Sequence, residues 1–202
     1  MSGIGDIMRM GPVIPVLVVH DAAEAFPLAQ ALVAGGLRAL EVTMRTPAAL
    51  DAIAEMKRVP GAIVGAGTVV NLDQFEAVRA ADAEFIVSPG LSERLGEAVV
   101  ESGVPYLPGV ATAGDIMRGL DLGLTAFKFF PAETSGGLKA LKALAAPFSQ
   151  CRFCPTGGIT RETVRDWLAM EPVLCVGGSW IAEGAPAEIE AKARAAAELR
   201  KR

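Results

Sequence analysis

Short apolar runs alternate with amphipathic stretches along the chain, at a spacing of about 20 to 26 residues. Each run is followed by Gly, Thr, Ser or Pro, and then by residues with the period of a helix. The eight runs are Val13–Val19, Ala39–Thr43, Ile63–Ala66, Phe85–Ser88, Tyr106–Gly109, Ala126–Phe129, Arg152–Thr156 and Val173–Gly177. Continuous apolar strands that alternate with amphipathic helices predict a parallel β-sheet covered by helices.

Eight such units favour an α/β fold in which the sheet closes into a (β/α)8 barrel. The chain has 202 residues, which is short for that fold, so we expect brief loops and a single domain over residues 1–202. An open, doubly wound sheet is the alternative architecture. Candidate caps precede several predicted helices, at Asp21, Asn71, Thr112 and Thr160. A charged, Ala-rich stretch predicts a last helix over Pro186–Arg202.

Charge and composition narrow the class of protein. The net charge is -4, with acidic and basic residues mixed along the chain, which argues against nucleic acid as the main partner. No apolar run approaches the ~20 residues of a membrane helix. The first residues lack the basic end and apolar centre of a signal peptide. We therefore expect a soluble, cytoplasmic protein that is not bound to a membrane.

Cysteine and histidine bear on metal chemistry. Cys151 and Cys154 form a C-x-x-C, but in a strand residues three apart point to opposite faces, which disfavours a metal or redox pair. The chain has one histidine, His20, so a histidine-built metal site is excluded. We expect no metal and no cofactor.

One lysine has an unusual setting. Lys128 stands in an apolar strand-like run, Ala126-Phe127-Lys128-Phe129-Phe130-Pro131, whereas the other lysines lie in polar, helix-like stretches. Burial disfavours the ammonium ion, and a neutral amine is a nucleophile that attacks carbonyl carbon. The alternative is a structural lysine whose head group reaches solvent at the end of the strand.

Small, polar or charged residues follow the predicted strands, where the active site of a barrel lies. Glu41 is a second charge inside an apolar run, either a structural partner of Arg45 or Lys128 or an acid/base serving the lysine. Arg45 is either a surface residue or a ligand for a substrate carboxylate. Loops after strands seven and eight often bind phosphate through backbone N–H groups and a helix N-terminus, and the glycine-containing pairs Gly157-Gly158 and Gly178-Ser179 stand there.

These segments closely resemble the bacterial 2-keto-3-deoxy-6-phosphogluconate (KDPG) aldolases, the class I aldolases of the Entner–Doudoroff pathway. The resemblance is carried by Leu40-Glu41-Val42-Thr43 with Arg45, Val64-Gly65-Ala66-Gly67-Thr68, Ser88-Pro89-Gly90, Phe127-Lys128-Phe129-Phe130-Pro131-Ala132-Glu133, Arg152-Phe153-Cys154-Pro155-Thr156-Gly157-Gly158-Ile159 and Gly177-Gly178-Ser179-Trp180. It covers roughly residues 8 to 181. His20 departs from the pattern, since many relatives carry a lysine there.

The resemblance implies a compact (β/α)8 barrel, a homotrimer, and cleavage of KDPG to pyruvate and glyceraldehyde 3-phosphate, with activity on 4-hydroxy-2-oxoglutarate as well. It implies Lys128 as the Schiff-base lysine and Glu41 as the acid/base. The remaining implied ligands are the pyruvate-lining residues Arg45, Thr68 and Thr156, the walls Pro89 and Phe130, and the phosphate-binding residues Gly157, Gly158, Gly178 and Ser179.

Two other functions are compatible with the residues alone. One is a phosphosugar epimerase or isomerase in which Glu41 is the base and Lys128 acts only through its charge. The other is a non-catalytic barrel that binds a phosphorylated ligand, because a fold alone does not define a function.

Overall fold

The computed structural model describes residues 3–199. The first two and last three residues of the predicted domain, and with them the end of the predicted C-terminal helix, lie outside this range. The strands are β1 (Val13–Leu17), β2 (Ala39–Thr43), β3 (Ile63–Gly67), β4 (Ile86–Val87), β5 (Tyr106–Leu107), β6 (Gly109–Val110), β7 (Ala126–Phe129), β8 (Arg152–Pro155) and β9 (Val176–Gly178).

Helices alternate with these strands. They are α1 (Ile4–Arg9), η1 (Ala22–Glu24), α2 (Ala25–Ala34), α3 (Ala49–Lys57), α4 (Leu72–Ala80), α5 (Glu93–Ser102), α6 (Ala113–Asp121), α7 (Gly137–Ala145), α8 (Val164–Leu168), η2 (Trp180–Ala182) and α9 (Pro186–Ala197), with η marking 3-10 helices. No helix among residues 3–199 is long and apolar enough to cross a membrane.

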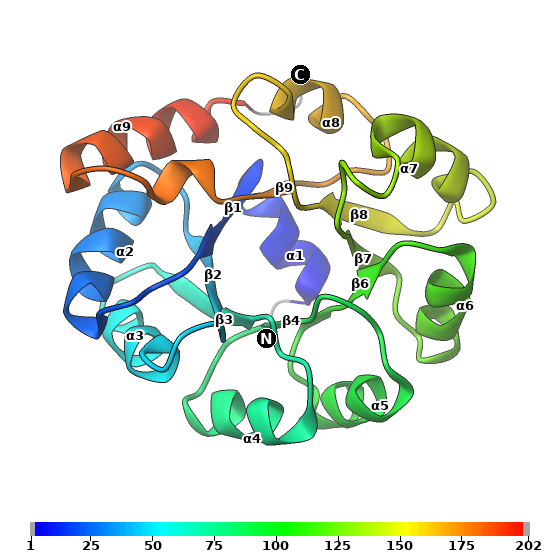
Figure 1. Cartoon of the computed structure of the whole chain (residues 1–202), viewed down its shortest axis with the longest axis horizontal. Coiled ribbons are helices and arrows are strands. Elements are labelled where there is room, and N and C mark those ends of the chain that lie inside the picture. Colours follow the sequence, from blue (N-terminus) through cyan, green and yellow to red (C-terminus); the bar gives the residue numbers. More distant parts are fainter. Residues whose placement is uncertain (1–2, 200–202) are drawn as a thin grey trace.

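All strand pairs are parallel, in the orders β5-β4-β3-β2-β1-β9 and β6-β7-β8. The strands curve round a ring, and α2 to α9 lie on its outer side (Figure 1). An open doubly wound sheet carries helices on both faces, so the curled parallel sheet disfavours that alternative. The fold is therefore α/β with a curled parallel sheet.

The predicted strand positions are confirmed, with changes at their ends. The fifth run is divided into β5 and β6 at Pro108, which has no N–H to donate to a neighbouring strand. The first run ends at Leu17 rather than Val19, and Val18 is exposed. The last strand begins at Val176, because Val173 makes only an isolated bridge with Phe153.

Caps at Asn71 and Thr112 are confirmed, and two others differ. The Asn71 side chain accepts from the backbone N–H of Gln74, and Thr112 forms a reciprocal capping box with Asp115. Asp21 caps the short η1, so the α-helix proper begins three residues later than its position suggests. Thr160 as a cap is wrong: α8 follows Thr163, and Thr160 belongs to the preceding turn.

Two apolar clusters hold the fold together. The larger one joins the outer face of the sheet to the helices. The smaller one lies inside the ring, where Ile7 and Met8 of α1 belong to one buried cluster with Phe85, Leu107 and Cys175. It includes Ala39 and Ala126, the first residues of β2 and β7, so α1 covers the amino-terminal ends of the strands. Apolar side chains thus fill the interior at the amino-terminal ends of the strands, which leaves the carboxyl ends for polar side chains.

The cysteines follow the predicted alternation. Cys151 belongs to the outer cluster, whereas Cys154 faces the interior with Cys175, and all three are buried and free. The hydrogen bond with Cys154, together with burial, raises the pKa of the Cys175 thiol well above its usual value. A protonated thiol is a poor nucleophile, and Cys175 lies with Cys154 in the inner apolar cluster, so we interpret both as packing residues of the interior.

Candidate active site

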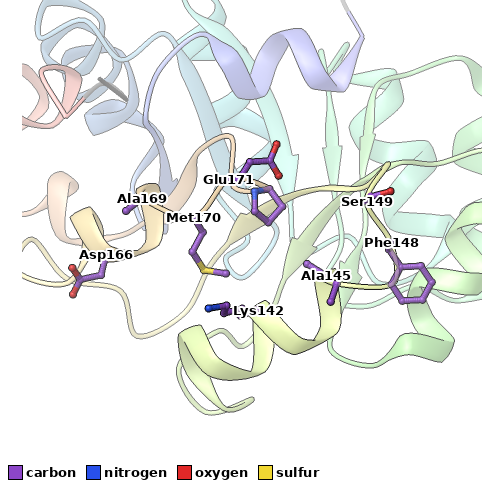
Figure 2. Close-up of a pocket in the computed structure, with 10 residues that line it drawn as sticks. Lys142, Ala145, Phe148, Ser149, Asp166, Ala169, Met170 and Glu171 are labelled. Carbon is purple, nitrogen blue, oxygen red and sulfur yellow. The ribbon is translucent and has the colours of Figure 1, made fainter.

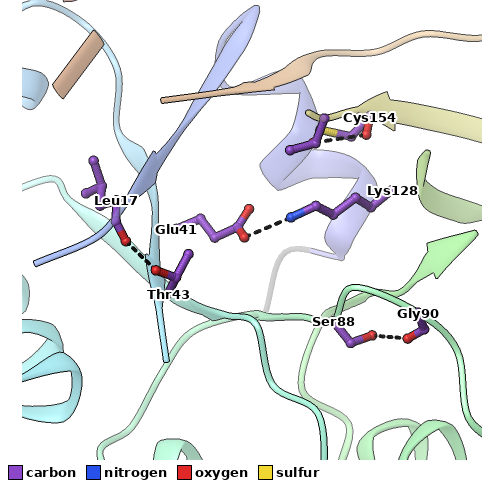
Figure 3. Close-up of polar contacts among 8 residues, drawn as sticks. Leu17, Glu41, Thr43, Ser88, Gly90, Lys128 and Cys154 are labelled. Atoms are coloured by element: carbon purple, nitrogen blue, oxygen red, sulfur yellow. Dashed lines mark hydrogen bonds and ion pairs between the residues drawn. The ribbon is translucent and has the colours of Figure 1, made fainter. Parts of the chain in front are cut away.

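Lys128 on β7 points into the interior and not to solvent. The residue is 4% exposed, and its Nζ lies 3.0 Å from Oε1 of Glu41 (Figure 3). Nζ also lies 5.3 Å from the centroid of the Phe130 ring, within the range of a cation–π contact. The alternative of a lysine that reaches solvent at the strand end is therefore wrong.

Glu41 reaches the lysine from β2, across the interior. Its backbone is paired with Val16 of β1 and Gly65 of β3, and the residue is 2% exposed. The carboxylate pairs with Lys128, and residues 3–199 contain no ion pair between Glu41 and Arg45. Of the two structural partners considered for Glu41, the structure selects the lysine.

A glycine creates the space for this carboxylate. A Cβ atom at Gly67 would lie 2.2 Å from Oε1 of Glu41, so even alanine would displace the carboxylate. In the same strand, a Cβ atom at Gly65 would meet the Phe85 ring at 2.5 Å. Of the two glycines of β3, Gly67 thus leaves space for the carboxylate, and Gly65 leaves space for the Phe85 ring of the inner apolar cluster.

Stability alone does not explain this buried pair. Removing two charges from water costs about as much as their attraction returns, and apolar replacements of buried pairs are often neutral or stabilising. The pair nevertheless stands inside an apolar run on each strand. A desolvated amine and carboxylate within hydrogen-bond distance can exchange a proton, which is the chemistry of amine-based carbonyl catalysis.

Two buried threonines stand near the strand ends. Thr156 follows β8, and a Cβ atom at Gly177 would lie 2.2 Å from its Oγ1, so the strand-nine glycine makes room for the hydroxyl. Thr43, at the end of β2, donates from Oγ1 to the Leu17 carbonyl over 2.8 Å. Sequence reasoning did not select Thr43 as a site residue, although it lies two residues after Glu41, on the same face of the strand.

The other predicted pyruvate ligands lie in loops that follow strands. Arg45 is exposed after β2, while Thr68 after β3 and Pro89 after β4 are half-buried. Thr68 has a φ of 58°, a left-handed conformation that is unfavourable for a β-branched residue. Strain of this kind is concentrated at functional sites, which supports Thr68 as a candidate. The half-buried Phe130 is in contact with the lysine head group.

The predicted phosphate residues lie in two neighbouring loops. An isolated parallel bridge joins Thr156 to Gly177, so the chain after β8 runs beside β9. Gly157 and Gly158 have φ values of 103° and 80°, which only glycine adopts readily. Gly178 is buried, with its α-carbon against the Trp180 ring, and Ser179 is exposed just beyond it. The required adjacency of the two loops is therefore present.

A cavity of about 540 Å³ lies elsewhere, between α7 and α8. Its lining includes Lys142, Phe148, Met170 and Glu171, and none of the predicted site residues (Figure 2). The candidate site is thus marked by its buried charges and not by this cavity. Among residues 3–199, no group of three or more His, Cys, Asp or Glu side chains is arranged to hold a metal ion.

The curled parallel sheet and the buried amine–carboxylate pair define the class: an α/β protein with a site suited to amine-based chemistry on a carbonyl substrate. Residues 4–196 match the family model described as KDPG and KHG aldolase. The chain belongs to this family.

Individual relatives agree with the family assignment. The 2-dehydro-3-deoxy-phosphogluconate aldolase of Zymomonas mobilis is 58% identical over 90% of this chain and 87% of its own. A crystal structure of the Zymomonas mobilis enzyme with 3-phosphoglycerate has a TM-score of 0.96 at 54% identity, covering 98% of this chain and 96% of that one. The Legionella pneumophila KDPG aldolase, with pyruvate captured as a covalent carbinolamine, has a TM-score of 0.94 at 41% identity, covering 97% and 98% of the two chains.

Proposed function

We propose that this protein is a class I aldolase that cleaves KDPG to pyruvate and glyceraldehyde 3-phosphate, a step of the Entner–Doudoroff pathway. It also cleaves 4-hydroxy-2-oxoglutarate, which is the same compound as 2-keto-4-hydroxyglutarate (KHG), to pyruvate and glyoxylate. This is the second activity in the family's description. The observation that carries the proposal is the buried Lys128–Glu41 pair in a chain of this family. The carbinolamine captured in the Legionella enzyme supports an amine mechanism.

In the proposed reaction, Nζ of Lys128 attacks the C2 ketone, and loss of water gives an iminium ion next to the bond that breaks. Glu41, directly or through a water molecule, takes the proton of the C4 hydroxyl. The C3–C4 bond then breaks and the aldehyde leaves. The electron pair of the broken bond moves toward the iminium ion, which becomes an enamine. Protonation at C3 by Glu41 and hydrolysis release pyruvate. One carboxyl group serves both steps because it gains a proton in the first and loses it in the second.

We assign the pyruvate end and the phosphate end of the substrate to different sets of residues in the loops after the strands. Arg45, Thr68 and Thr156 bind the pyruvate end, with Pro89 and Phe130 as walls. Backbone N–H groups around Gly157, Gly158 and Gly178, with the Ser179 hydroxyl, bind the phosphate. The adjacency of the loops after β8 and β9, and the left-handed conformations at Gly157 and Gly158, support this assignment.

We also propose that the curled sheet closes into a (β/α)8 barrel that forms one domain. Support comes from the parallel bridges Phe153–Val173 and Thr156–Gly177 between β8 and the chain at β9, and from β5 and β6, which are separated by Pro108 alone. The homotrimer and the cytoplasmic location stay predictions.

Borohydride reduction in the presence of pyruvate tests the function. We expect one reduced pyruvyl group per chain, located at Lys128 by mass spectrometry, and no adduct in Lys128→Ala. Lys142, on the outer face at α7, is the matched control, and Lys142→Ala should be labelled like the unaltered protein. An epimerase that uses Lys128 only as a charge would show no adduct, and a non-catalytic barrel would show no turnover of either substrate.

A further inference from the structure

Tyr106 and Ser88 form a buried hydroxyl pair with no part in the mechanism above. Tyr106 on β5 is 2% exposed, and Ser88, directly after β4, is 1% exposed. The Tyr106 hydroxyl lies 2.7 Å from Oγ of Ser88, and that Oγ lies 2.6 Å from the carbonyl oxygen of Gly90. Figure 3 shows Ser88 reaching the Gly90 carbonyl.

Proton counting gives the direction of this chain of bonds. A carbonyl oxygen only accepts, so the one hydroxyl hydrogen of Ser88 is directed to Gly90. The Tyr106 hydroxyl must therefore donate to Ser88. Burial raises the pKa of Tyr106 to about 12, so the phenol keeps its proton throughout the neutral range. The turn formed by Pro89 and Gly90 is thus held by two hydrogen bonds in series.

The same turn is held from its other side by a backbone contact. A Cβ atom at Gly109 would lie 2.1 Å from the Pro89 carbonyl oxygen and 2.7 Å from the Gly90 nitrogen, so the bare backbone of β6 packs against this peptide. Gly109 is the register partner of Lys128 in the pairing of β6 with β7. The turn therefore lies beside the strand position that carries the lysine.

We propose that Tyr106 and Ser88 are positioning residues for the keto-acid end of the active site. Tyr106 orients Ser88, Ser88 holds the Pro89–Gly90 turn, and the turn keeps Pro89 as a wall beside the imine formed at Lys128. The inference rests on the proposed function, because it gives the pair a role in binding pyruvate.

The test measures pyruvate binding separately from the rate of chemistry. Exchange of the pyruvate methyl protons with deuterium gives a half-saturating concentration and a limiting rate. Loss of one buried hydrogen bond of ordinary strength predicts that Tyr106→Phe raises the half-saturating concentration about two- to tenfold. Ser88→Ala removes both bonds and should raise it about ten- to a hundredfold. The limiting rate should change less in both variants.

Three controls separate positioning from general stability. Ser102→Ala removes a hydroxyl bonded over 2.6 Å to the carbonyl of Val99 in α5, the same chemical change away from the site, and should leave both parameters unchanged. Ser88→Thr keeps the hydroxyl and should restore most of the binding. Tyr106→Phe should add nothing in a Ser88→Ala background, because Tyr106 acts only through Ser88.

The proposal is overturned if folded Tyr106→Phe and Ser88→Ala both retain the wild-type half-saturating concentration, or if their effects multiply in the double variant. If Ser88→Ala does not fold, Tyr106→Phe decides, since it keeps the ring and the bond from Ser88 to Gly90. If borohydride does not trap pyruvate on Lys128 of the wild-type protein, the proposed function is overturned first, and the positioning role with it.

Discussion

Lys128 and Glu41 lie 87 positions apart in the chain, yet their side chains meet at 3.0 Å inside the ring of strands. One comes from β7 and the other from β2, so neither strand nor any local turn brings them together. They meet because both strands line the same interior, in which Gly67 leaves space for the carboxylate.

Glu41→Gln should slow proton transfer while leaving imine formation possible. The amide is close in shape to the carboxylate but cannot take a proton, and positioned acid/base groups contribute about 10²–10⁴-fold. We expect borohydride to trap pyruvate on the variant, whereas exchange of the methyl protons with deuterium falls by about that factor. Exchange at the wild-type rate would remove Glu41 from the mechanism.

Gly67→Ala should impair activity although it adds a single methyl group. That group would lie 2.2 Å from Oε1 of Glu41, and a displacement of about 1 Å at a catalytic group can cost about a hundredfold. Gly114→Ala in α6 is the matched control, because its Cβ atom would meet nothing closer than 3.8 Å. We expect kcat to fall in the first variant only. Equal kcat values in the two would show that the Glu41 position is not critical.

Ser179→Ala tests the phosphate site with an internal control. A hydrogen bond to a charged group contributes about 1.5–3 kcal/mol, so kcat/KM for KDPG should fall about ten- to a hundredfold. Activity on 4-hydroxy-2-oxoglutarate, which has no phosphate, should be nearly unchanged. An equal loss on both substrates would mean that the residue is structural. Gly178→Asp is a poor test, because its Cβ atom would lie 2.0 Å from the Trp180 ring and disturb the fold.

Tyr106 should make the folded protein lose stability at high pH. Burial raises its pKa from 10.0 to about 12, so the unfolded chain loses the phenolic proton at lower pH than the folded one. The stabilising contribution of protonated Tyr106 to the free energy of unfolding is complete below about pH 10 and is lost as the pH rises to about 12. Two pKa units correspond to about 3 kcal/mol.

Denaturant unfolding of wild-type protein and Tyr106→Phe across this range measures the effect. The difference in the free energy of unfolding between the two proteins should shrink, or reverse, by that amount from about pH 10 to about pH 12. Other groups that titrate there are shared by the two proteins and cancel. A constant difference would show that Tyr106 does not titrate as a buried phenol.

Much of the fold follows from local patterns. The strand Ala126–Phe129 is predicted with both of its ends correct, and a glycine-containing turn precedes its apolar run. The exceptions also have local causes that are easily misjudged, such as Pro108, which divides one apolar run into two strands. Thr160 looks like a cap, but the turn it begins delays the helix to Val164.

The sequence by itself determined that Lys128 and Glu41 are unusual, because a charge within an apolar run is costly wherever the chain goes. It also determined the order of strands and helices, since periodicity is a local property. Only the tertiary structure decided that the two charges pair with each other. The same holds for Tyr106 on β5 and Ser88 directly after the neighbouring β4, and for Gly67 beside Glu41. These contacts depend on strand register and on the curvature of the whole sheet, which no short stretch of sequence contains.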